Sequence, residues 1–194
     1  MIKSLVFIFI VMLSACASFD KTNIQPGHRV IGLGFSFTVP TEKSWFAVEY
    51  GTSHRIKLSQ LNNKDSYSIL VSLNRGPYNE MYQSAEAHLK AIKQYKNLQR
   101  TTPGLIQHSH QEWIEAHYNQ QCVRYSSLSE DARGRNNLGP ATVNLIGLSC
   151  QHPSLKNVLI TTSFTRRSDE DASKVDITTF ADQLFSSFEF TGVE

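Results

Sequence analysis

Two histidines and a glutamate in one polar stretch are the residues of this chain best suited to bind a metal ion. His108, His110 and Glu112 are spaced two apart, within a polar segment at residues 105–118 whose alternation is typical of a β-strand. Residues two apart on a strand project from the same face, so both imidazoles and the carboxylate could reach one ion. His117 lies at an odd offset and would join them only if the strand bends.

The alternative interpretation of this stretch is a polar strand surface that faces solvent. Gln107, Ser109 and Gln111 would then form the other face of the same strand. We assign no metal and no other cofactor, and we keep His108, His110 and Glu112 as candidates only.

Other catalytic patterns are missing from the sequence. It has no G-x-S-x-G motif of a serine hydrolase. Gly32-x-Gly34 lacks the third glycine of a dinucleotide-binding loop and leads into a predicted strand. Pairing Cys122 or Cys150 with His152 would need a free thiol as the nucleophile. We therefore assign no catalytic residue.

Five arginines are the remaining candidates for a binding site, here for an anion. They would form a basic patch if their strand ends cluster, and the alternative is a scattered, solvated face. These residues are Arg124, Arg133, Arg135, Arg166 and Arg167.

The first sixteen residues carry the clearest signal in the sequence. Lys3 supplies a positive charge, and Leu5–Leu13 is an apolar run too short to span a bilayer as a helix. The run ends in Leu13-Ser14-Ala15-Cys16. This arrangement resembles the signal of bacterial lipoproteins, in which a leucine and two small residues precede a cysteine.

The resemblance implies that Cys16 is lipidated and that residues 1–15 are removed. The thiolate of a cysteine is the nucleophile that would take the lipid. Ala17 stands where an aspartate favours inner-membrane retention, so we expect the outer membrane, facing the periplasm, if the organism is Gram-negative. The alternative is a plain signal peptide in which Cys16 occurs by chance.

Export determines how the other two cysteines are interpreted. With Cys16 taken by lipid, Cys122 and Cys150 remain, and two cysteines in an exported chain predict one disulfide. Two free buried thiols are the alternative. Removing Lys3 with the leader leaves 18 basic and 17 acidic residues, a near-neutral balance that does not favour nucleic acid as a partner.

Alternating apolar residues predict a sheet of six to eight antiparallel strands. Four strands at about 34–39, 45–50, 54–61 and 66–74 follow one another with short turns, which favours a meander. Further strands are predicted at 105–118, 122–128, 141–151 and 157–165, with an exposed loop at 129–140.

Apolar spacings of three and four residues predict two main helices, at about 79–97 and 172–188. The resulting α+β order, with the Phe-x-Phe-x-x-Pro opening at Phe35 followed by Trp45, resembles the family of PsbP and Mog1. The resemblance implies an antiparallel sheet flanked by helices and a binding or accessory role. We expect a signal peptide at 1–15, a lipidated tether at 16–30 and a single domain at 31–194.

These observations favour a lipid-anchored envelope protein that acts as a non-enzymatic binding or accessory module. Its partners would be the membrane, through the lipid on Cys16, and a protein or envelope component. One alternative is an envelope hydrolase or metal-dependent enzyme with its site near His108, His110 and Glu112. Another is a carrier of an apolar ligand, held between the sheet and the helix at 79–97.

Overall fold

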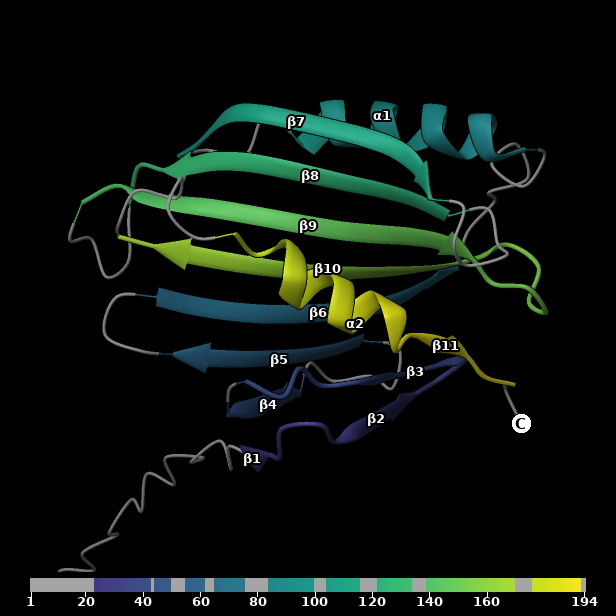
Figure 1. Ribbon diagram of the computed structural model, residues 1–194. Helices are drawn as coiled ribbons and strands as arrows, with labels where there is room; N and C mark the ends of the chain where they lie inside the picture. Colours follow the sequence, from purple (N-terminus) through teal and green to yellow (C-terminus); the bar gives the residue numbers. More distant parts are fainter. Residues whose placement is uncertain are drawn as a thin grey trace, which may run out of the picture.

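The computed structural model describes residues 23–42, 44–49, 55–61, 65–75, 84–99, 104–115, 122–133, 139–169 and 176–192. An antiparallel sheet of eight strands, in the order β1-β4-β5-β6-β10-β9-β8-β7, forms most of the fold. A second sheet has the order β11-β3-β2. Two helices complete the α+β architecture that the sequence predicts, and Figure 1 shows the large sheet with β7 at its upper edge.

The large sheet contains five long strands at its centre and upper edge and shorter strands toward β1. Its strands are β1 (Asn23–Ile24), β4 (Trp45–Glu49), β5 (Arg55–Leu61), β6 (Asp65–Arg75), β7 (Leu105–Glu115), β8 (Cys122–Asp131), β9 (Ala141–Gln151) and β10 (Val158–Ser168). The small sheet consists of β2 (Arg29–Gly32), β3 (Phe35–Thr38) and β11 (Glu189–Phe190). The helices are α1 (Ala85–Gln99) and α2 (Thr178–Ser186).

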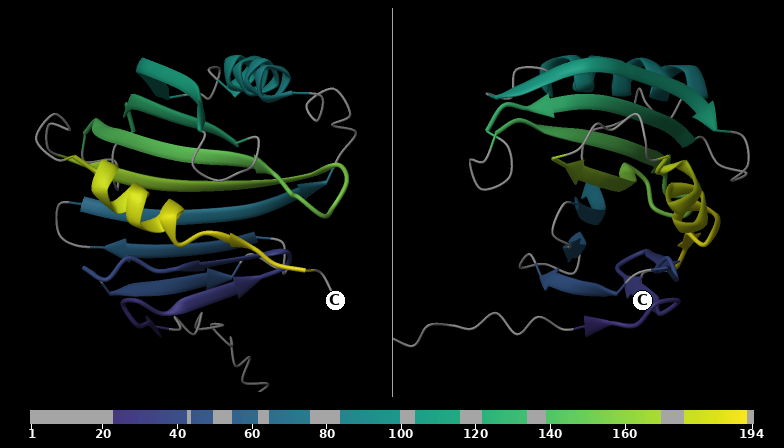
Figure 2. Two further views of the ribbon diagram at one scale, coloured as in Figure 1. Left: turned by 45° about the vertical axis from the view of Figure 1, so that its right-hand side comes forward. Right: turned by 60° about the vertical axis from the view of Figure 1, so that its left-hand side comes forward.

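One face of the large sheet, called the core face below, packs against α2 and the small sheet (Figure 2). Phe164 of β10 stacks on Phe180 of α2 with ring centroids 5.7 Å apart, and it meets Trp45 edge-on at 6.0 Å. The hydroxyl of Ser187 fixes the end of α2 to β3, because it accepts the Thr38 N–H at 2.9 Å and donates to the Leu184 carbonyl at 2.8 Å. Aromatic packing therefore joins the two sheets through α2.

The opposite face, called the outer face, packs against α1 over β7 and β8. Leu89 and Ile92 of α1 contact the cluster formed by Val123 and Tyr125 of β8. The Tyr125 ring lies over Gly147, its neighbour on β9, where a Cβ atom would overlap the ring. The helix–sheet interface proposed for an apolar ligand is thus occupied by these side chains.

The small sheet changes the predicted meander. β4, β5 and β6 do pair in sequence order, but β3 lies in the other sheet, between β2 and β11. β6 then pairs with β10 and not with the next strand in the chain. The change arises because Phe35 and Phe37 face the core from a separate layer.

Residues 23–30, predicted as part of the tether, belong to the folded domain. β1 pairs with β4, and β2 pairs with β3. Arg29 also forms an ion pair with Glu189 near the other end of the chain. The domain therefore begins before Ile31.

Both helices start later than the apolar spacing predicts. In α1, the Ser84 hydroxyl accepts the Ala87 N–H at 3.1 Å, which satisfies one of the N–H groups at the helix start. In α2, the Asp176 carboxylate accepts the Thr178 N–H at 2.7 Å. These two polar side chains mark the helix starts, whereas residues 79–83 and 172–175 lie outside the described part of the chain.

Candidate functional site

A β-bulge in β7 separates the residues predicted to share a metal ion. Gln107 pairs with Ser129 and Ser109 with Leu128, so His108 is the extra residue between two regular pairs. The His108 side chain approaches Glu130, whereas His110 lies opposite Ser127. Glu130 and Ser127 project from opposite faces of β8, because their offset is odd.

The expectation that His108, His110 and Glu112 line one face is therefore wrong. The His108 Nε2 atom is 3.8 Å from a Glu130 carboxylate oxygen on the core side, with half of the His108 side chain exposed. His110 and Glu112 contact each other on the outer face and are almost buried. Within the described ranges, no three His, Cys, Asp or Glu side chains gather as a metal site would require. His117 lies outside those ranges.

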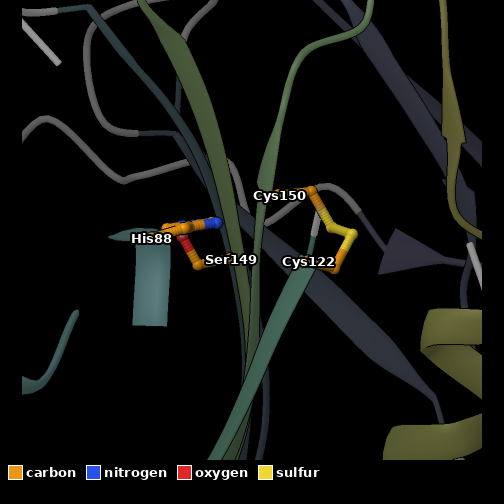
Figure 3. Close-up of a disulfide and its surroundings, with 4 residues drawn as sticks. All are labelled: His88, Cys122, Ser149 and Cys150. Carbon is orange, nitrogen blue, oxygen red and sulfur yellow. Dashed lines mark hydrogen bonds between the residues drawn. A yellow bond between two sulfur atoms is a disulfide. The ribbon is translucent and has the colours of Figure 1, made fainter. Parts of the chain in front are cut away.

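The two cysteines face each other on neighbouring strands. Cys122 of β8 and Cys150 of β9 are direct partners in the ladder, with Cα atoms 4.2 Å apart, and their sulfurs form a disulfide. Both side chains lie on the core face, and the bridge joins β8 to the centre of the sheet (Figure 3). Because these sulfurs are bonded, neither is available as a nucleophile. Cys16 lies outside the described residues.

A histidine that the sequence analysis did not single out lies on the other side of the same strands. His88 of α1 is fully buried, and its Nε2 atom is 3.2 Å from the hydroxyl of Ser149 (Figure 3). The signal was its spacing, four residues before the apolar Ile92 on the same helix face. Ser149 is itself fully buried, so the pair joins α1 to β9 without presenting a serine to a substrate.

His152 also has a structural role, because both of its ring nitrogens form hydrogen bonds to the backbone. Its Nδ1 atom accepts the backbone N–H groups of Ser154 and Leu155, both at 3.1 Å. Its Nε2 atom then carries the proton and donates to the Gly34 carbonyl at 3.1 Å. Both ring nitrogens therefore hold the turn after β9, and His152 is not placed to activate a cysteine.

The arginines do not form a basic patch, because each described one has an acidic partner. Arg166 is almost fully buried and contacts Asp65 at 2.9 Å and the Ser168 hydroxyl at 3.1 Å. Arg167 contacts Asp131 at 2.8 Å, and the exposed Arg133 lies 4.0 Å from the same carboxylate. Arg135 lies outside the described residues.

Arg124 of β8 contacts side chains of two other elements, β7 and α2. Its guanidinium contacts Asp182 of α2 at 2.6 Å and Glu115 of β7 at 3.8 Å. The same group lies over two rings, 5.6 Å from the centre of Trp113 and 5.4 Å from that of Phe185. Arg124 therefore connects β7, β8 and α2 at the border of the packed core.

Beyond this arginine the core face carries exposed apolar side chains. Ile106 is 53% exposed and lies opposite Glu130, which His108 approaches, whereas Trp113 is 38% exposed and lies opposite Arg124. We name these residues, with Arg124, the β7–β8 patch. Exposed tryptophan and arginine surrounded by polar groups are typical of protein-binding surfaces.

Two helix-start carboxylates have perturbed ionisation. Hydrogen bonds from its own backbone N–H and from the Ser84 hydroxyl lower the pKa of Glu86. Hydrogen bonds from the Thr178 hydroxyl and backbone N–H lower the pKa of Asp176. Both groups are exposed and support helix starts, and neither belongs to the β7–β8 patch.

Comparison with known proteins gives likeness of fold only. No family model and no curated protein matches the chain. Among solved structures, it resembles the Ran-binding protein Mog1p of Saccharomyces cerevisiae, with a TM-score of 0.45 and 8% identity over 88% of this chain and 95% of that one. It also resembles the cyanobacterial PsbP protein of Synechocystis, with a TM-score of 0.47 and 13% identity over 92% and 99%.

No helix in the described part of the chain is long and apolar enough to cross a membrane.

Proposed function

We propose that this protein is a lipid-anchored module of the bacterial cell envelope that binds a protein or another envelope component without catalysing a reaction. The anchor is the lipid on Cys16, and the site of binding is the β7–β8 patch. The observation that carries the binding role is the distribution of exposed apolar side chains. Three of the five large ones in the described residues, Ile106, Trp113 and Ile114, lie on the single strand β7.

The position of the patch supports recognition of a macromolecule. Scattered single apolar residues on a surface are ordinary, whereas a cluster with a polar rim favours an interface. Ile106 and Trp113 both belong to the core face of β7, and Trp113 lies against the Arg124 guanidinium that Asp182 holds in place. A partner contacting this patch would meet apolar area next to side chains that are already ordered, which lowers the entropy cost of binding.

The anchor is tested by the substitution Cys16→Ser in the full chain. A serine hydroxyl is not a substitute for the thiolate that takes the lipid, so labelled fatty acid should not be incorporated. The variant should also leave the membrane fraction, since several acyl chains are what would hold the protein there. If Cys16→Ser remains membrane-bound and lipid-labelled, the anchor is wrong.

The binding face is tested by a photoreactive amino acid placed at Ile106 in the native envelope. Leu61 of β5 provides a matched control, because it is 54% exposed but lies outside the patch. Irradiation should produce an adduct of defined mass from position 106 and none from position 61. Equal adduct formation from both positions would contradict the patch as the binding face.

A further inference from the structure

The free edge of β7 is the longest exposed strand edge in the described structure. β7 has eleven residues and ends the eight-stranded sheet, pairing with β8 on one side only (Figure 1). The opposite end of the sheet is β1, which has two residues. Unpaired backbone N–H and C=O groups along a long edge form a template for another strand.

The devices that usually block such an edge protect only one end of β7. Its bulge lies at His108, and the strand contains no lysine and no proline. From Ser109 to Glu115 the pairing with β8 is regular, so the backbone of this segment is extended and its edge away from β8 is straight enough to pair with another strand. Trp113 and Ile114 are exposed on opposite faces of it, which provides apolar contacts on both sides of an added strand.

The sequence of this segment is complementary to itself. If two copies lie antiparallel with Gln111 opposite Gln111, each His110 faces the Glu112 of the other copy on the outer face. Trp113 then faces Ser109 on the core face. A register centred on Glu112 would instead place two carboxylates opposite each other, which is unfavourable.

We propose that β7 pairs with β7 of a second copy of this chain around a two-fold axis at Gln111. The two eight-stranded sheets then join into one continuous sheet, and the interface is isologous, with the same strand contributed by each copy. The occupant is a second copy because this register sets His110 beside the Glu112 of the other copy, next to the same contact within each chain, and places no two carboxylates opposite each other. This inference does not rest on the proposed function, because it is argued from the edge of β7, although Trp113 of the β7–β8 patch also contacts the added strand.

A cysteine scan of the full chain tests the register. In an antiparallel pair the residue on the axis faces itself, with Cα atoms about 4.5–5.5 Å apart, which is within reach of a disulfide. Gln111→Cys should therefore give a band at twice the chain mass on a non-reducing gel, and reduction should remove it. Ser109→Cys is the control, because Ser109 would face Trp113 and not itself.

Mixing the chains sharpens the test. Ser109→Cys and Trp113→Cys should each remain at the mass of one chain, but co-expressed they should form the doubled band. A doubled band from Ser109→Cys alone, equal to that from Gln111→Cys, would overturn the proposal, because it would indicate random collision. The absence of any doubled band from Gln111→Cys would overturn it as well.

A charge substitution provides a measurement without cross-linking. Gln111→Lys places two ammonium groups opposite each other at the axis, so the full chain in detergent should sediment at half the mass of the unsubstituted protein. Leu61→Lys, at an exposed position on β5, should leave the mass unchanged. A monomeric unsubstituted protein would contradict the dimer.

Discussion

The two faces of the large sheet differ in how much apolar surface they bury. Among the described residues, the core face belongs to a cluster of 21 buried residues that includes both sheets and α2, whereas the cluster under α1 contains three. Apolar burial therefore stabilises the fold mainly from one side. β7 and the outer part of β8 depend more on specific links, which are the Cys122–Cys150 bridge, the Arg124 contacts and the His88–Ser149 hydrogen bond.

The largest expected effect comes from replacing one isoleucine on each side of the large sheet, which tests this difference with the same residue type. Ile160→Ala removes a fully buried side chain from the core face, and we expect a loss of about 4 kcal/mol in the free energy of unfolding. Ile92→Ala, on the side of α1 that faces the sheet, should cost about 2 kcal/mol, because fewer buried neighbours surround it. Urea unfolding at equilibrium measures both values, and equal losses would show that the two faces contribute alike.

A smaller effect is expected from removing the bridge that connects the two regions. Replacing both Cys122 and Cys150 by alanine should lower stability by about 3–4 kcal/mol, the loop-closure value for a sequence separation of 28. If β7 and β8 depend on this link, their amide hydrogens should exchange faster while those of β6 and β10 change less. Uniform acceleration across all four strands would argue against a separate outer region.

The smallest effect concerns the start of α2 and its pH dependence. Because Thr178 lowers the pKa of Asp176 in the folded state, this contribution to stability is present above the ordinary value of 3.8 and disappears as pH falls through the lowered pKa. Asp176→Asn keeps an acceptor but does not titrate, so it should reduce the loss of stability on acidification. Urea unfolding at neutral and acidic pH measures the free energy of unfolding of both proteins. If it depends on pH identically in Asp176→Asn and in the unsubstituted protein, Asp176 does not contribute to the pH dependence.

The sequence predicts the regular elements of this fold better than its irregular ones. β9 is found at its predicted bounds because a loop that ends at Pro140 precedes it and the turn at His152-Pro153 follows it. β1 and β2 were missed, since strands of two and four residues are too short to show a period. Assigning β3 to a separate sheet required knowing that β2 and β11 pair with it.

At the candidate site, the sequence pattern did not predict which side chains share a face or which are buried. A single extra residue in β7 moves every following side chain to the other face, and no local signal marked His108 as that residue. The burial of Arg166 was also hidden, because its partner Asp65 is 101 residues away in the sequence. The exposed Ile106 and Trp113 were predicted to lie on a strand, but only the sheet order shows that this strand is an edge.

The position of β3 between β2 and β11 has a consequence for the order in which the chain can complete its fold. β2 lies near the start of the domain and β11 near its end, yet both pair with β3, and the Thr191 N–H donates to the Gly34 carbonyl at 3.1 Å. During synthesis, the small-sheet layer that contains Phe35 stays uncovered until Phe188 and Phe190 have been made. The domain thus finishes folding only after the ribosome has released nearly all of it, and a chain truncated before Glu189 would keep this aromatic layer open to chaperones and proteases.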